Sequence, residues 1–126
     1  KVIYFDFWAR WCPPCLAEME PLKQLRSKFS TDDLIIYSIC VSEPKEQWEE
    51  CLNEYSLRNR GIECVHVTDY LGIDNYQKIR KQWKIDRMPY YILINRQGQI
   101  IDFGTAARPS NPQLVSRIEE AVKDTK

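Results

Sequence analysis

Residues 7–15 read Phe-Trp-Ala-Arg-Trp-Cys-Pro-Pro-Cys and join a short apolar run to a segment with helical periodicity. The apolar run, Val2 to Phe7, is rich in β-forming residues and predicts a strand buried on both faces. The segment that follows, from about Pro13 to Phe29, repeats its apolar residues at helical spacing. Because prolines are tolerated in the first turn of a helix, Cys12 and Cys15 are expected at the N-terminal end of this helix.

This position suits disulfide exchange, which needs a thiolate. A cysteine at a helix N-terminus faces unpaired backbone N–H groups and the positive end of the helix dipole. Such surroundings lower the pKa of the thiol into the range of roughly 3.5 to 7. Two intervening residues place the second sulfur one turn further on, close enough to form a bond. We therefore expect Cys12 to be the exposed attacking thiol and Cys15 the more buried resolving thiol.

Two other uses of the cysteine pair are a zinc site and a purely structural disulfide. A zinc site needs a second pair of ligands at metal spacing, and the other candidates, Cys40, Cys51, Cys64 and His66, do not form one. A structural disulfide leaves the two prolines and two tryptophans of the motif unexplained. The five cysteines are odd in number and irregularly spaced, which argues against a disulfide framework. We interpret the remaining three as small buried apolar residues and His66 as structural.

The rest of the chain alternates between strand and helix patterns. Strands are expected at 34–41, 64–67, 90–95 and 99–103, and helices at 46–55, 74–83 and 113–123. This order predicts an α/β domain in which helices cover a mixed sheet. With no repeat, low-complexity tract or linker, residues 1–126 are expected to form one domain.

Composition excludes several functions. Lysine plus arginine and aspartate plus glutamate number 18 each, so the formal net charge is zero and nucleic-acid binding is not expected. No apolar stretch is long enough to span a bilayer, and the residues from Lys1 onward do not show the n-region and h-region pattern of a signal peptide. Because the chain opens directly on a strand, we expect it to be a domain cut from a longer precursor with its own targeting segment.

The active-site stretch resembles a known family. Asp6-Phe7-Trp8-Ala9-x-Trp11-Cys12-x-Pro14-Cys15 is similar to the thioredoxin signature. The Pro-Pro dipeptide and the long gap before the next motif resemble the TlpA/ResA-like envelope oxidoreductases. The resemblance runs from Val2 to about Val122 and implies a thioredoxin-like mixed sheet with flanking helices. It also implies a central α-β insertion, here around Pro44 to Val67.

A second family mark lies at Ile85-Asp86-Arg87-Met88-Pro89-Tyr90. The resemblance implies a cis-proline at Pro89, opening the strand opposite the active site. The backbone at Met88 would then pair with an extended substrate segment, and Trp11 would border the attacking sulfur. The alternative is a proline that merely starts a strand.

Asp6 places a carboxylate inside an apolar strand, which is unfavourable unless the group is neutral or paired. The resemblance implies that Asp6 is the general acid/base for Cys15. The alternative is a structural aspartate hydrogen-bonded to the backbone. Glu18, about one turn after Cys15, fits either a family acid or a solvated helix face.

Three features depart from the family pattern. Pro21 comes one residue later after Cys15 than expected, which places the usual proline kink in doubt. Arg87 occupies a position that is often glycine and could narrow or charge the substrate groove. The strand or hairpin that normally precedes Val2 is missing.

The resemblance implies a thiol–disulfide oxidoreductase that reduces protein disulfides in the bacterial periplasm or cell envelope. Its partners would be protein thiols and disulfides and an upstream redox partner, with no cofactor and no membrane insertion by this domain. One alternative is a non-catalytic redox sensor or interaction module on the same fold. Another is a peroxiredoxin-like peroxidase, whose lone cysteine in a Thr-x-x-Cys context this motif does not supply.

Overall fold

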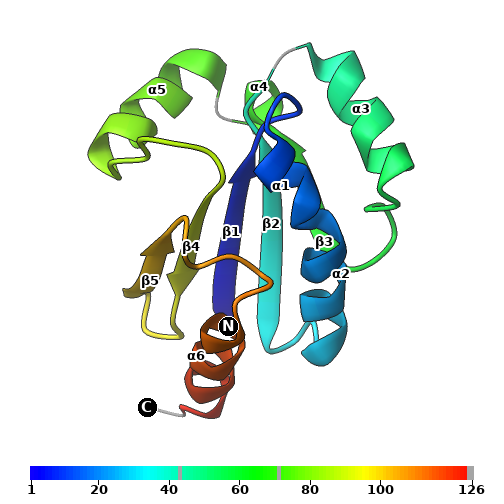
Figure 1. Cartoon of the computed structure of the whole chain (residues 1–126). Coiled ribbons are helices and arrows are strands. Elements are labelled where there is room, and N and C mark those ends of the chain that lie inside the picture. The colour runs from blue at the N-terminus through cyan, green and yellow to red at the C-terminus, as the bar shows by residue number, and fades with distance from the viewer. Residues whose placement is uncertain (43, 71, 125–126) are drawn as a thin grey trace.

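Five strands form one mixed sheet in the order β3–β2–β1–β4–β5 (Figure 1). The computed structural model describes residues 1–42, 44–70 and 72–124. The strands are β1 (Val2–Trp8), β2 (Leu34–Cys40), β3 (Ile62–His66), β4 (Tyr90–Ile94) and β5 (Ile100–Gly104). The first three run parallel to one another, whereas β4 is antiparallel to β1 and β5 is antiparallel to β4. The predicted mixed sheet is thereby confirmed.

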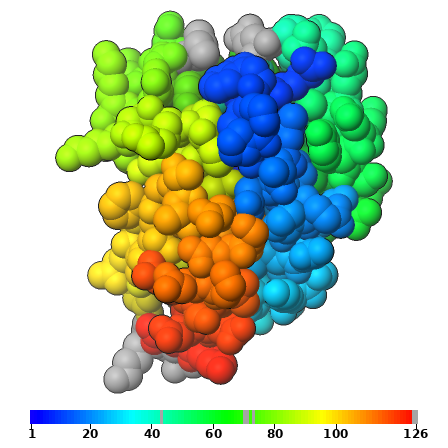
Figure 2. Space-filling view, viewed as in Figure 1, coloured from blue at the N-terminus to red at the C-terminus, as the bar shows by residue number. Residues whose placement is uncertain are grey.

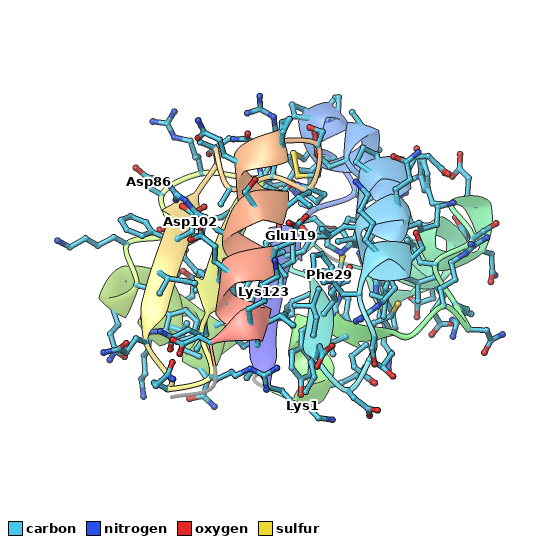
Figure 3. All side chains as sticks on the ribbon, turned by 90° about the horizontal axis from the view of Figure 1, so that it is seen from below. Lys1, Phe29, Asp86, Asp102, Glu119 and Lys123 are labelled. Carbon is cyan, nitrogen blue, oxygen red and sulfur yellow. A yellow bond between two sulfur atoms is a disulfide. The ribbon has the colours of Figure 1, made fainter. Side chains whose placement is uncertain are left out.

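Helices cover both faces of this sheet. They are α1 (Pro13–Ala17), α2 (Met19–Lys28), α3 (Lys45–Glu54), α4 (Val67–Tyr70), α5 (Gly72–Gln82) and α6 (Pro112–Lys123). The larger core cluster joins buried side chains of α1, α2, α3 and α6 to one face of the sheet, and α2 and α6 lie side by side there (Figure 3). A smaller cluster joins α4 and α5 to the opposite face. The predicted α-β insertion corresponds to α3 and β3.

The side chains of strand β1 contribute to both clusters, because they alternate between the two faces of the sheet. Tyr4 and Trp8 are fully buried in the larger cluster, and Phe7 belongs to the smaller one. Because side chains alternate along a strand, Asp6 shares the face of Tyr4 and Trp8. The sheet therefore directs Asp6 toward the side that carries α1 and its cysteines.

The prediction of a single helix over 13–29 is wrong, because the chain forms two helices separated at Glu18. Pro21 has no backbone N–H and cannot bond to the carbonyl of Ala17 one turn earlier. The Glu18 amide instead bonds to the carbonyl of Cys15 at 3.2 Å, and Leu22 resumes the regular pattern with a 2.9 Å bond to Glu18. The displaced proline thus produces a break between α1 and α2.

The short helix α4 was also not predicted. Val67 was expected to end a strand, but it begins α4, and β3 starts two residues earlier than expected, at Ile62. Val67 is fully buried in the smaller core cluster. Its apolar character therefore reflects burial in a helix, which periodicity over four residues cannot distinguish from burial in a strand.

Arg26 is a buried cation that holds the end of α2 to the start of β2. Its guanidinium donates to the carbonyl oxygens of Leu34 (2.6 Å), Phe29 (2.9 Å) and Ser30 (3.0 Å). Only 4% of the residue is exposed, and burial lowers its pKa below the usual arginine value. Phe29 is the C-cap residue of α2 and Leu34 is the first residue of β2, so these bonds tie the end of the helix to the start of the strand.

We expect Arg26→Met to lower the free energy of unfolding by about 2–4 kcal/mol, because it removes the three hydrogen bonds of the buried guanidinium while keeping an apolar side chain. Urea unfolding followed by circular dichroism measures the change. Arg117→Met is the matched control, since Arg117 forms a half-exposed ion pair with Asp102 at 2.9 Å. That change should remove less than about 1 kcal/mol. Equal losses in the two variants would contradict the role assigned to Arg26.

Candidate active site

Cys12 and Cys15 form a disulfide at the N-terminal end of α1. Cys12 is the N-cap residue, and its Sγ accepts a hydrogen bond from the Cys15 amide at 3.3 Å. The two Cα atoms lie 5.3 Å apart, well within the range that a disulfide requires. Pro13 and Pro14 fill the first turn of the helix, as predicted. A Cys12 thiolate at this position would face the free N–H groups of the helix end.

The expected difference in exposure between the two sulfurs is wrong for this disulfide-bonded state. Cys12 is 3% exposed and Cys15 is 2% exposed, and both belong to the larger core cluster. The neighbouring Trp11 is instead 69% exposed, and Arg10 is also exposed. Trp11 is the large apolar side chain that the active-site loop presents to solvent.

The predicted cis bond at Met88–Pro89 is confirmed. It immediately precedes β4, whose first residue, Tyr90, pairs with Phe7 on β1. Pro89 is buried, and Met88 is half-buried against both core clusters. Figure 2 shows the surface of the active-site segment (blue) directly beside the segment that precedes β4 (yellow-green). The sheet thus brings the proline motif next to the loop that carries Cys12.

Asp6 is almost fully buried, with 4% of the residue exposed. Burial, followed by the charge of Glu18, raises the pKa of its carboxyl from 3.8 to about 8. Across the described ranges its carboxyl makes no hydrogen bond, so the alternative of an aspartate bound to the backbone finds no support. A buried acid with a pKa near neutrality is suited to give and take protons.

Glu18 lies at the junction of α1 and α2 and is partly covered. Its carboxylate accepts hydrogen bonds from the Ser110 amide (2.9 Å) and the Ser110 hydroxyl (2.8 Å). These bonds fasten the helix junction to the loop between β5 and α6. Glu18 is therefore more than one charge on a solvated helix face, and it lies close enough to Asp6 to affect its pKa.

The remaining candidates have structural contacts. Trp8 is fully buried and donates to the Ser38 hydroxyl at 2.9 Å. His66 is fully buried between the carbonyl of Ser42 (2.8 Å) and the hydroxyl of Thr68 (2.7 Å). Cys40 and Cys51 are buried free thiols, and Cys64 is a half-buried one. Burial raises the pKa of all three thiols, so they remain protonated and unreactive at neutral pH.

Two further findings concern the described residues as a group. In the part of the chain that the structure describes, no three His, Cys, Asp or Glu side chains come together as metal ligands would. Among the helices described, none has both the length and the apolar character needed to cross a membrane.

Arg87, at the position often occupied by glycine, keeps a largely exposed side chain beside Asp86.

The sheet order, the disulfide at a helix N-terminus and the cis-proline define a class, the thioredoxin-fold thiol–disulfide oxidoreductases. The chain belongs to the Redoxin family, whose model matches residues 1–122.

Individual relatives agree with this assignment. The thiol-disulfide oxidoreductase ResA of Halalkalibacterium halodurans is 24% identical over 123 residues, which cover 98% of this chain and 63% of that protein. A candidate thiol-disulfide oxidoreductase from Bacteroides vulgatus is 32% identical, with a TM-score of 0.74 over 95% of this chain and 72% of that one. A thiol:disulfide interchange protein from a Bacteroides species shares the fold, with 21% identity and a TM-score of 0.78 over 100% of this chain and 76% of that one. The chain thus spans less than two thirds of the curated ResA relatives that it matches.

Proposed function

We propose that this domain reduces disulfide bonds of other proteins in the bacterial cell envelope by means of Cys12 and Cys15. One observation carries the proposal: the two cysteines form a disulfide at a helix N-terminus, directly beside a cis Met88–Pro89 bond. The envelope setting is supported by the resemblance of the Pro-Pro motif and the long central insertion to TlpA/ResA-like envelope oxidoreductases. An upstream redox partner would return the domain to its dithiol form.

In the proposed reaction the reduced domain attacks with the Cys12 thiolate. Its sulfur forms a bond to one sulfur of the substrate disulfide, and the other substrate sulfur leaves as a thiolate that takes a proton from water. Asp6 accepts the proton of Cys15, and the Cys15 thiolate then attacks Cys12 Sγ. This attack breaks the bond between Cys12 and the substrate, and the second substrate sulfur leaves as a thiolate that takes a proton from water. The substrate leaves with two added electrons, and the domain is left with the Cys12–Cys15 disulfide.

Met88, Pro89 and Trp11 would position the substrate. The backbone at Met88–Pro89 precedes β4 and offers an edge along which an extended substrate segment could pair. Trp11, 69% exposed, supplies an apolar side chain beside the sulfurs. The disulfide of the substrate would then lie over Cys12.

The test is the reduction potential of the Cys12–Cys15 pair, read from tryptophan fluorescence in graded thiol/disulfide buffers. We expect one reversible two-electron transition near the reducing end of the range for this fold, about −270 mV. The double variant Cys12→Ser/Cys15→Ser, which keeps the three free cysteines, should show no transition. A potential near about −120 mV would instead indicate an oxidant. Absence of any reversible transition would favour an interaction module that carries out no disulfide exchange.

A further inference from the structure

The hydroxyl of Thr105 holds the carbonyl of Pro89, the residue that immediately precedes β4. Its Oγ1 donates to the Pro89 oxygen at 3.2 Å. Thr105 directly follows β5 and lies 16 positions along the chain from Pro89. The bond therefore joins the loop between β5 and α6 to the proline motif beside the cysteines.

The backbone pairing between β4 and β5 stops just before this point. Its last pair is Tyr91 with Gly104. Gly104 has a φ of 96°, a conformation that glycine adopts readily, and there the chain leaves the strand. No backbone amide of the described residues donates to the Pro89 carbonyl. The side chain of Thr105 thus takes the place of the next bond in the sheet.

This bond fixes the one backbone torsion of Pro89 that the proline ring leaves free. The ring holds φ at about −65°, so ψ, which sets the direction of the carbonyl, is the remaining soft torsion. Thr105 holds this carbonyl, and the next residue, Tyr90, is paired with Phe7 on β1. The peptide unit between Pro89 and Tyr90 is therefore held from both sides, and it sets the direction in which Met88 leaves the sheet.

Met88 is the residue whose backbone depends on this arrangement. It is half-buried, and within the described part of the chain neither its amide nor its carbonyl has a backbone partner. Unpaired backbone groups beside a strand are the groups with which an extended peptide can pair. Such a peptide forms regular hydrogen bonds only where these groups keep a fixed direction.

The loop that carries Thr105 is itself firmly held. The Tyr4 hydroxyl donates to the carbonyl of Ala107 at 2.6 Å within the core. The amide and the hydroxyl of Ser110 donate to the Glu18 carboxylate, at the junction of α1 and α2, at 2.9 and 2.8 Å. Figure 2 shows the surface of this loop (orange) beside both the blue and the yellow-green segments. Thr105 therefore reaches Pro89 from a fixed base.

We propose that Thr105 is a positioning residue for the substrate of Cys12. By holding the Pro89 carbonyl, its hydroxyl sets the direction of the Met88 backbone, along which the segment around a protein disulfide binds. This inference rests on the proposed function and concerns its binding step, because Thr105 acts through Pro89 and not on the sulfurs. The residue thus favours extended peptide segments over small disulfides that have no backbone to pair.

The experiment compares Thr105→Val with Thr105→Ser in the chain of 126 residues. Valine keeps the branched shape and lacks the hydroxyl, whereas serine keeps the hydroxyl. The two substrates are a peptide with one intrachain disulfide and bis(2-hydroxyethyl) disulfide, which has no peptide backbone. Ser116→Ala is the matched control, because the Ser116 hydroxyl donates to the carbonyl of another proline, Pro112, at 3.4 Å on α6. The measurements are kcat, KM and the reduction potential of the cysteine pair.

For Thr105→Val we expect KM for the peptide to rise by about fivefold with kcat nearly unchanged, since one partly exposed hydrogen bond to the binding edge is lost. The rate with bis(2-hydroxyethyl) disulfide and the reduction potential of the Cys12–Cys15 pair should equal those of the parent chain. Thr105→Ser and Ser116→Ala should keep the parent KM for the peptide.

A Thr105→Val variant with the parent KM for the peptide would overturn the inference. Equal slowing with both disulfides would overturn it too, because the effect would then lie at the sulfurs. A Thr105→Ser variant as impaired as Thr105→Val would also contradict it, since the methyl group and not the hydroxyl would matter. These outcomes leave the proposed function in place when the parent chain reduces both disulfides. If the parent chain reduces neither, the proposed function itself fails, and the inference fails with it.

Discussion

Replacing Cys15 by serine is expected to stop turnover and to leave the substrate bound to Cys12 as a mixed disulfide. Cys12 can still attack, but no neighbouring thiol remains to resolve the adduct. The resolving sulfur lies in the next turn of α1, with its Cα 5.3 Å from that of Cys12, so its attack is intramolecular. External thiols at about millimolar concentration cannot match the effective molarity of such an arrangement, and turnover should fall by at least about a thousandfold. Non-reducing mass spectrometry detects the adduct.

Cys64→Ser is the matched control for this experiment. Cys64 is a half-buried thiol that packs against the larger core cluster, and its sulfur hydrogen-bonds to the carbonyl oxygens of Ile62 and Leu57 at 3.7 and 3.9 Å. Its replacement should leave turnover within about twofold of the parent chain. The variant Cys12→Ser/Cys15→Ser should form no adduct. Wild-type turnover by Cys15→Ser would show that the pair does not act as attacker and resolver.

The order of strands and helices along the chain and the cysteine pair were accessible from the sequence because each depends on local patterns. The apolar run at Val2 to Phe7 and the prolines after Cys12 dictate a strand followed by a helix start, whatever the rest of the chain does. The cis bond before Pro89 was predicted only through the resemblance, since the same residues could begin a strand with a trans bond. The motifs therefore located the site before its geometry was known.

What remained out of reach depends on contacts between distant segments. The burial of Cys12 follows from the packing of its sulfur in a core that α2, α3 and α6 complete. The contact between Thr105 and Pro89 is set by the register between β4 and β5, which a pattern of apolar residues does not specify. In the sequence Thr105 is one more polar residue in a loop. The link from Glu18 to Ser110 joins residues 92 positions apart.

Replacing Asp6 by asparagine is expected to stabilise the domain above neutral pH. The folded-state pKa of Asp6 is about 8, raised from 3.8 first by burial and then by Glu18. Between these values the folded chain holds a proton that the unfolded chain has released, so stability falls as pH rises. The stabilising contribution of neutral Asp6 is complete below about pH 4 and is lost as pH rises to about 8, a total on the order of 5 kcal/mol. Urea unfolding across this interval measures the slope, which Asp6→Asn should remove.

Asp6→Asn should also slow the step in which Cys15 resolves the mixed disulfide. The same substitution would therefore raise stability and lower activity. Asparagine cannot take the proton of Cys15, so the resolution rate should fall by about a hundredfold and lose the limb of its pH profile near pH 8. Asp102→Asn is the control, because Asp102 lies on β5 and is paired with Arg117 at 2.9 Å. That change should alter stability by less than about 1 kcal/mol and leave the pH profile in place. If Asp6→Asn kept the parent chain's dependence of stability on pH and its resolution rate, Asp6 would neither titrate as a buried acid nor act as the base for Cys15. A buried acid that lowers stability at the pH where it works is expected to persist only where the chemistry of Cys15 requires it.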